Sequence, residues 1–548
     1  MTGALTAAFL ATVGLPLLLA AALAVPAGRR AVPGLAVLAP LPGLLAALLA
    51  PGGEAQIGWL LFGLRVGFGE TGRPVLAAAA AVWLLAALHL RGTPWGDGGR
   101  TRFLLFFLPC MAATLGAALV LDRPGFYLFF GGATLASYGL IVTDASGSRR
   151  RAGRLYLALA LIGELAVLAG LLTQTLGGLP ATAALLLYAG FGAKLGILPL
   201  HVGLPPAYRA APPAGAAPLA GPVLTVAVLG WLRFMPIGAE AEALPGPGTA
   251  ILVLGLAAAF YGAAIGSLQR QAAALLAYSS ISQMGILLAA LGLALSADGS
   301  EARHALAGAA LLFAVHHTLA KSALFLGLGA ERRRPGGSLV FPALVVLSLS
   351  LTGLALTGGA LGKLWIEEGA AALETDRAAL LATLLPATSV ATTLLMARFL
   401  WLTRHPPHGA RGPAWTVPAL TVAALAGPWA LLVARHPEPA KLALGTSHLW
   451  HTAWPVGLGI ALAVAIGFAA RGRRRRIAVA PGDIGAPLLR LSGRAWAVPS
   501  LRLPVPGAPD LSWLATLPAA DLRLRPLAVY GSVLLLLFLV VMMLTTLA

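Results

Sequence analysis

Long apolar runs follow one another along almost the whole chain, separated by short breaks that hold glycine, proline or arginine. A helix needs about 20 apolar residues to cross the hydrocarbon core of a bilayer, and the runs repeatedly reach that length. The pattern predicts an all-α polytopic membrane protein of about sixteen transmembrane helices, over residues 4–25, 32–50, 74–91, 103–121, 125–143, 153–176, 180–201, 214–235, 248–268, 271–295, 304–329, 339–366, 378–402, 415–434, 451–470 and 527–547. The apolar piece at 56–68 is too short to cross and is expected to lie at the interface or on its neighbours.

Composition supports a bilayer as the solvent of this chain. Hydrophobic residues make up 59% of its 548 residues and charged residues 10%, which leaves too little polar surface to cover a soluble globule. Cys110 is the only cysteine, so neither a disulfide framework nor a cysteine-based metal site is expected. The first apolar run has no basic leader before it and is expected to be a retained helix rather than a cleaved signal.

The net charge of +19 would indicate nucleic acid in a soluble protein, but the positions of the arginines favour another explanation. They gather in the loops that follow odd-numbered spans, which is the positive-inside pattern. The basic loops are therefore predicted to face the cytoplasm of a prokaryotic cell, with the protein in the cytoplasmic (inner) membrane and both termini on the other side. The cluster at 471–476 is expected to contact anionic lipids at the cytoplasmic face, and no nucleic acid partner is expected.

Lysine usage points to where the chemistry lies. The chain has 34 arginines and only four lysines, and three of the four, Lys194, Lys321 and Lys363, fall inside predicted spans. A charge inside a bilayer is costly, so each is a functional candidate. A buried lysine can lose its proton near neutral pH whereas arginine effectively cannot, which suits a proton relay. The alternative is that these lysines snorkel to the interface or form structural pairs.

The surroundings of the first two lysines favour a relay. Pro199 is expected to break the helix just beyond Lys194 and to expose backbone groups that water solvates, and His201 follows within the same motif. His317 lies four residues before Lys321, on the same helical face, so the two side chains can exchange a proton. The neighbouring His316 is expected to point away from Lys321, where it either packs against other side chains or takes part in the relay.

The third lysine and one carboxylate complete the candidate set. Lys363 follows a glycine-rich stretch in which Gly358 and Gly359 are expected to loosen the helix. Glu164 is the clearest carboxylate inside a span, and it is expected to pair with Lys194 on the next helix, or else to make a structural hydrogen bond. Metal ligands and catalytic residues are not expected.

Together these segments resemble the antiporter-like membrane subunits of respiratory complex I, of Mrp sodium/proton antiporters and of membrane-bound hydrogenases. Four motifs carry the resemblance, in the family's order, between about residue 190 and residue 370. They are Lys194, Gly196, Pro199, His201, Leu204, Pro205, Ala207, Ala211 and Pro212; Leu276 to Ile281 with Gly285; His317, Lys321, Leu324, Phe325 and Leu326; and Leu351 to Leu354, Thr357, Gly359 and Lys363.

The resemblance implies two inverted five-helix repeats with broken helices. It divides the chain into N-terminal helices at 1–101, a first repeat at 102–236, a second repeat at 247–402, and C-terminal helices at 415–548 with a basic extramembrane segment at 471–526. It also implies a multisubunit complex with other membrane subunits as partners, and H+ or Na+ that passes by Lys194, His317, Lys321 and Lys363 in either direction. The chain by itself is not expected to be an enzyme, and it resembles no flavin, haem, iron–sulfur or quinone site, so no cofactor is expected.

One departure from the family bears on conduction. The family carries a glutamate on its fifth helix, where this chain has Gly131. Either Glu164, on the next helix, takes over the role of that carboxylate, or the part of the ion path next to Lys194 is impaired. A non-conducting structural subunit is therefore the main alternative, and a standalone solute or cation permease is another.

Overall fold

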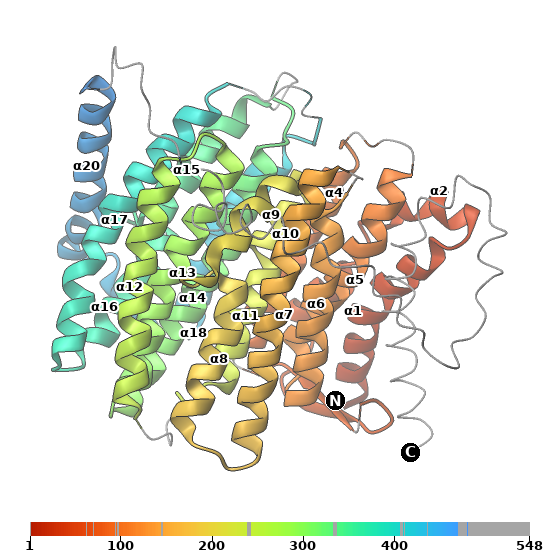
Figure 1. Cartoon of the computed structure of the whole chain (residues 1–548), viewed down its shortest axis with the longest axis horizontal. Coiled ribbons are helices and arrows are strands. Elements are labelled where there is room, and N and C mark those ends of the chain that lie inside the picture. Colours follow the sequence, from red (N-terminus) through yellow and green to blue (C-terminus); the bar gives the residue numbers. More distant parts are fainter. Residues whose placement is uncertain are drawn as a thin grey trace, which may run out of the picture.

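Helices build nearly all of the protein (Figure 1). The computed structural model describes residues 2–469, apart from 62, 70, 94, 96–97, 144–145, 238–242, 333–336, 406–408, 410 and 436, together with residue 479. The span expected at 527–547 and the basic segment expected at 471–526 lie outside the described residues, apart from residue 479.

The N-terminal part differs from the predicted pattern at two places. One span was expected at 32–50, but the chain turns at 36–40 and forms two short helices. Pro40 and Pro42 at the junction lack backbone N–H donors and are well tolerated at the start of the second helix. The piece at 56–68, for which no type of element was predicted, contributes to an antiparallel hairpin, and the hairpin bridges to Val120. The elements in order are α1 (Thr2–Ala22), α2 (Pro26–Leu35), α3 (Leu41–Leu49), β1 (Glu54–Ile57), β2 (Leu64–Gly67) and α4 (Gly72–Leu90).

The middle part contains the first broken helices. A span expected at 180–201 is continuous only to Leu195, and the span expected at 214–235 is divided at Gly221. The elements are α5 (Gly99–Leu119), α6 (Arg123–Ile141), α7 (Gly147–Thr175), α8 (Pro180–Leu195), the 3-10 turn η1 (Leu200–Gly203), α9 (Leu204–Ala210), α10 (Pro213–Ala220) and α11 (Pro222–Phe234).

The second half contains another broken helix, where the span expected at 339–366 is interrupted at 353–357. Its elements are α12 (Pro245–Ser267), α13 (Ala272–Ser296), α14 (Ser300–Gly327), the 3-10 turn η2 (Gly337–Leu339), α15 (Val340–Thr352), α16 (Gly358–Ala371), α17 (Asp376–Thr403), α18 (Thr416–Arg435), α19 (Pro437–Leu442) and α20 (Thr446–Ala469).

Twelve helical segments within the described residues are long and apolar enough to cross a membrane, with the pieces from α8 to α9 and from α10 to α11 each counted as one. The chain is therefore a polytopic helical membrane protein. Three other predicted spans are not among the twelve. The segments at 32–50 and 339–366 are each divided into shorter helices. Helix α6 is continuous but less apolar, because it begins with Arg123 and Pro124 and contains several glycines.

A glycine stripe brings α12 and α13 into close contact. A Cβ atom added to Gly255 would lie 2.6 Å from the backbone nitrogen of Ala289, and one added to Gly285 would lie 2.5 Å from the backbone nitrogen of Ala259. Small residues at such positions let membrane helices approach to backbone contact, where dispersion replaces the hydrophobic effect as the attraction. Gly285, the last residue of the Leu276 to Ile281 motif, is thus a packing residue that holds α13 in position.

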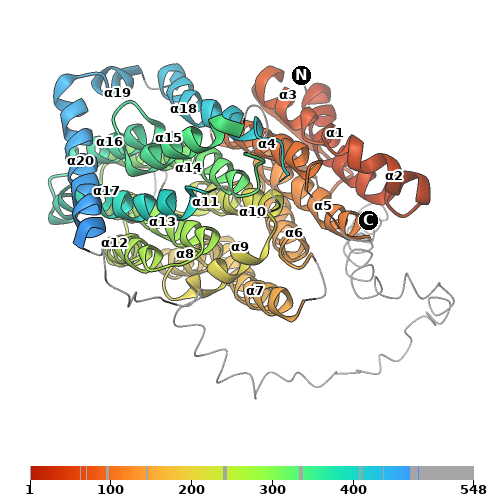
Figure 2. The same cartoon turned by 90° about the horizontal axis from the view of Figure 1, so that it is seen from above.

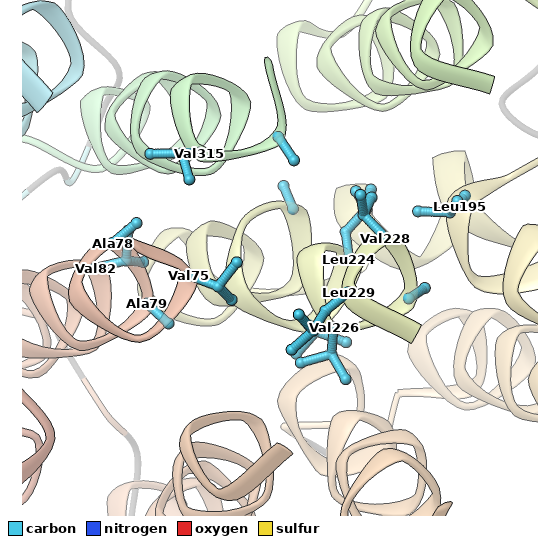
Figure 3. Close-up of a cluster of buried hydrophobic side chains, with 14 of the residues drawn as sticks. Val75, Ala78, Ala79, Val82, Leu195, Leu224, Val226, Val228, Leu229 and Val315 are labelled. Carbon is cyan, nitrogen blue, oxygen red and sulfur yellow. The ribbon is translucent and has the colours of Figure 1, made fainter. Parts of the chain in front are cut away.

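The centre of the bundle is formed by α13 and α14, whose apolar windows are buried along their whole length, whereas α20 is peripheral. Viewed from above, α14 lies between α13 on one side and α15 and α16 on the other (Figure 2). Figure 3 shows side chains of α4, α8, α11 and α14 in one apolar cluster, with Val75, Leu224 and Val315 among them. A charge within the apolar window of α14, such as that of Lys321, is therefore enclosed by protein rather than by lipid.

Candidate functional site

Lys194 lies in the last turn of α8, directly before the break. The helix ends because Gly196 adopts a positive φ of 79°, which glycine takes without steric cost. The following Leu198–Pro199 peptide is cis, and the chain continues through η1 into α9. A cation in this turn also faces the partial negative charge of the helix C-terminus.

The ammonium of Lys194 is buried and held by groups from two other helices. Its Nζ donates a hydrogen bond to the Phe130 carbonyl at 3.1 Å and lies 3.4 Å from Oε1 of Glu164. It also lies 3.4 Å from the centroid of the Phe130 ring, which gives a cation–π contact. The side chains of Lys194 and Glu164 are 3% and 7% exposed, so the expected pair forms as a buried ion pair.

Glu164 reaches this position from α7. Its Oε1 accepts a hydrogen bond from Thr134 of α6, while Oε2 has no hydrogen-bond partner among the described residues. A Cβ added to Gly131 would lie 3.7 Å from that Oε2 atom. The carboxylate of Glu164 therefore fills the space next to position 131, where the resemblance leads us to expect a glutamate.

Glu164 and Gly131 also line a cavity of about 1160 Å³ between α1, α5, α6 and α7. Asp122 and Arg123, at the start of α6, line the same cavity, and most of the remaining lining is apolar. The Glu164 carboxylate is thus a buried polar group at the wall of a mostly apolar cavity.

His201 is buried in η1, after the break. Its ring lies 5.1 Å from the ring of Tyr261 on α12, in an edge-on arrangement. The structure therefore places His201 between the first broken helix and the second half of the chain rather than on the Lys194 ammonium.

Lys321 and His317 occupy the centre of the bundle on α14. The Lys321 side chain is fully buried, and its Nζ donates to the carbonyl of Leu276 on α13 at 3.0 Å. No described carboxylate forms an ion pair with it. Neither ring nitrogen of His317 hydrogen-bonds to a described protein group. A buried polar group without a partner costs about 1–3 kcal/mol, so the His317 ring favours a hydrated interior.

Lys363 lies in the second turn of α16, directly after the break at 353–357. Gly353 and Leu356 in this break have φ values of 90° and 66°, and Trp429 of α18 donates to the Leu356 carbonyl at 2.9 Å. The Lys363 Nζ donates to the Thr352 carbonyl at 3.2 Å and to Ser389 Oγ at 2.7 Å. Its ammonium is therefore anchored at the interrupted backbone.

Gly358 and Gly359 begin α16 rather than interrupt it. A Cβ added to Gly358 would lie 2.6 Å from the His316 ring, and one added to Gly359 would lie 1.9 Å from the Ser350 carbonyl oxygen. Both glycines thus allow α16 to pack closely on α14 and α15. His316 shares a 2.7 Å hydrogen bond with Ser350 through its Nε2 atom and so links α14 to α15.

The sequence-based site did not include the hydroxyl groups that bind the charged side chains. Thr134 binds Glu164, Ser389 binds Lys363, and Ser350 binds His316. One of these hydroxyl groups could have been found from the sequence. Helix α17 has an unusual polar cluster for an apolar span, formed by Thr388, Ser389, Thr392 and Thr393.

Comparison with known proteins agrees with this architecture. Residues 178–388 match the family described as NADH:quinone oxidoreductase/Mrp antiporter, transmembrane. The chain is 30% identical to Hydrogenase-4 component B of Escherichia coli over 247 residues, which is 41% of this chain and 37% of that protein. The chain therefore matches less than half the length of this relative. The sequence-based resemblance to antiporter-like membrane subunits is confirmed.

Two solved structures share the fold. The structure of the Mrp complex from Dietzia sp. aligns with a TM-score of 0.67 at 22% identity, over 96% of this chain and 63% of that one. The structure of respiratory complex I from Thermus thermophilus aligns with a TM-score of 0.63 at 22% identity, over 81% of this chain and 99% of that one.

Proposed function

Because residues 178–388 match the model of the NADH:quinone oxidoreductase/Mrp antiporter family, we propose that this chain translocates protons, or sodium ions, as an antiporter-like subunit of a multisubunit membrane complex. The driving reaction, redox chemistry or an ion gradient, belongs to partner subunits. Other membrane subunits, anionic lipids at the cytoplasmic face and the ion itself are its partners. Its place is the cytoplasmic (inner) membrane of a prokaryote, with both termini on the non-cytoplasmic side.

The buried ion pair of Glu164 and Lys194 carries this proposal. Taking two charges out of water costs several kcal/mol per ion, and a pair of hydrophobic residues in the same place is often neutral or stabilising. A buried lysine–glutamate pair at a helix break therefore has little value for stability alone. The pair is instead suited to proton transfer, because two proton-binding groups are in contact and the charge of each changes the proton affinity of the other.

The route continues through the centre of the bundle. A proton that leaves the Glu164–Lys194 pair passes by His201 toward His317 and Lys321 on α14, and then to Lys363 on α16, or travels in the reverse direction. The unpartnered nitrogens of His317 and the carbonyl-bound ammonium of Lys321 favour water-mediated transfer along this stretch. Lysine suits each step because it can release its proton, unlike arginine.

The same proposal assigns the architecture of the family to the chain. The first repeat comprises residues 102–236 and the second 247–402, inverted relative to each other, with Lys194 and Lys363 next to equivalent helix breaks. Helices at 1–101 and 415–548 flank this core, and the full chain has about sixteen transmembrane helices. The protein is not an enzyme by itself, and the relay needs no cofactor.

A non-conducting structural subunit is the second candidate, and Gly131 is the observation that favours it. Glu164 argues against it, because its carboxylate lies next to the vacated position and contacts the lysine that the missing glutamate would contact. A standalone permease has less support, since the buried lysines lie on three different helices and the lining of the cavity described above is mostly apolar.

Proton uptake by sealed vesicles that contain the purified complex, driven by its own redox substrate or ion gradient, tests the proposal. We expect Lys194→Ala, Lys363→Ala and Glu164→Gln each to stop pumping while the complex stays assembled. Repeating the measurement with and without sodium identifies the ion. Unchanged pumping in all three variants would reject conduction and favour the structural subunit.

A further inference from the structure

An acidic and a basic side chain lie beyond Lys363, outside the route described above. Glu367 follows Lys363 by four residues on α16, so the two side chains emerge from the same helical face. His451 of the peripheral helix α20 lies opposite, and its Nε2 is 3.6 Å from Oε1 of Glu367. The α16 and α20 helices lie at the same edge of the bundle in both views (Figures 1 and 2).

Exposure increases steadily along these three residues. Lys363 is 4% exposed, the Glu367 side chain 21% and the His451 side chain 49%. The charges that act on Glu367 are those of His451, Lys363 and the neighbouring Glu368. The series therefore leads from the buried lysine to the surface in two steps, each between groups that bind a proton. The second step has the 3.6 Å contact, and the first joins two charged groups one helical turn apart.

Both helices place the pair toward one end of the bundle. Glu367 lies in the last part of α16, four residues before the helix ends, and His451 lies in the second turn of α20. This end is predicted to be the non-cytoplasmic one, because the loops that precede α15 and follow α20 carry the arginine clusters.

We infer that Glu367 and His451 form the outer end of the proton route, so that α20, a helix outside the two repeats, contributes a proton-carrying residue. This inference rests on the proposed function. In the outward direction the Lys363 ammonium gives up one proton, the Glu367 carboxylate takes it up, and the resulting acid passes it to Nε2 of neutral His451. The imidazolium then releases the proton from Nδ1, which restores the Glu367 carboxylate and leaves His451 with its proton on Nε2. A ring flip or a tautomer exchange through water then makes Nε2 the acceptor again.

A purely structural role explains the pair less well. An ion pair between partly exposed groups contributes about 0–1 kcal/mol, so it adds little to the attachment of α20. The packing of α20 rests instead on contacts such as Gly459 against Thr393 of α17, where an added Cβ would lie 2.5 Å from the threonine Cβ. Histidine is also the side chain that most readily exchanges a proton near neutral pH.

The test uses the full complex in sealed vesicles, with proton transport followed in Glu367→Gln, His451→Gln and the matched control His448→Gln, one turn earlier on α20. We expect at least about a tenfold lower rate in the first two variants and a native rate in the control, because removing a positioned proton donor or acceptor typically costs that much or more. Added imidazole should restore transport in His451→Gln, which a lost structural contact would not allow. Melting temperatures of all variants should stay near that of the native complex.

The outcomes separate this inference from the proposed function. If Lys363→Ala stops transport while Glu367→Gln and His451→Gln transport at the native rate, the outlet lies elsewhere and the relay stands. A slow His451→Gln variant that imidazole does not restore would show that the contact is structural and would overturn the inference. If the native complex moves no ions under its driving reaction, both proposals fall together.

Discussion

The carboxylate of Glu164 lies against the backbone of Gly131, with Oε2 3.7 Å from the point where a side chain at position 131 would begin. The two residues are on adjacent helices, α7 and α6, and the other carboxylate oxygen contacts the ammonium of Lys194. A glutamate that extends from either helix can therefore deliver its charge to the same lysine. We therefore expect a glutamate at position 131 and the glutamate at position 164 to be alternatives for the same role.

This relationship predicts that a glutamate at position 131 on α6 can replace Glu164. Glu164→Gln should abolish ion transport, because it leaves the Lys194 charge without its counter-ion, a loss that costs about 3–5 kcal/mol in buried pairs. Adding Gly131→Glu to that variant should restore transport and thermal stability, whereas Gly131→Glu alone should destabilise the protein by placing two carboxylates together. Vesicle transport and the melting temperature of the complex report both effects. A double variant as inactive as Glu164→Gln would show that the two positions are not equivalent.

The hydroxyl that binds Lys363 gives a second prediction. Ser389→Ala leaves the ammonium with the Thr352 carbonyl as its hydrogen-bond partner among the described residues, so we expect a loss of about 1–3 kcal/mol in stability and slower transport. Thr388→Ala is the matched control, because the Thr388 hydroxyl donates within its own helix to Leu385. Thermal unfolding of the two purified variants measures the difference. Equal melting temperatures would mean that Ser389 does not hold the lysine.

The helical spans could be predicted from sequence because each apolar run is long and the breaks are chemically distinct. The division of residues 32–50 could not be derived from apolar length, since that run is apolar throughout and only its prolines mark the turn. The pairing of β1 with β2 was missed for a related reason, because two strands of four residues carry too short an alternation to stand out.

The charged members of the site were visible in the sequence because a charge within an apolar span is rare. Their partners were not visible in the same way. Lys194 and Lys321 bind the backbone carbonyls of Phe130 and Leu276, which come from other helices, and a carbonyl that accepts such a bond has no sequence signature. Only the packing of the bundle brings these groups together.

The glycine stripe between α12 and α13 yields a stability prediction. Gly255→Leu should prevent the two backbones from approaching, displace α13 and cause loss of assembled protein, because the added side chain would meet the backbone of Ala289. Gly457→Leu on α20 is the control, since no atom lies within 4 Å of a Cβ added there. The yield of assembled complex in size-exclusion chromatography measures the effect. Similar yields of the two variants would contradict the packing argument.

Substitutions of Lys321 can test separately whether transport needs its positive charge or its ability to release a proton. The side chain is fully buried on α14 and no described carboxylate pairs with it, so Lys321→Met should keep or raise the melting temperature while it stops transport. Lys321→Arg keeps the positive charge but holds its proton permanently, so it should also stop transport if the lysine carries protons. Lys441→Met, in the peripheral helix α19, serves as the control and should transport normally. Native transport in Lys321→Arg would show that only the charge is needed, and the route would then bypass the lysine by way of His317 and water.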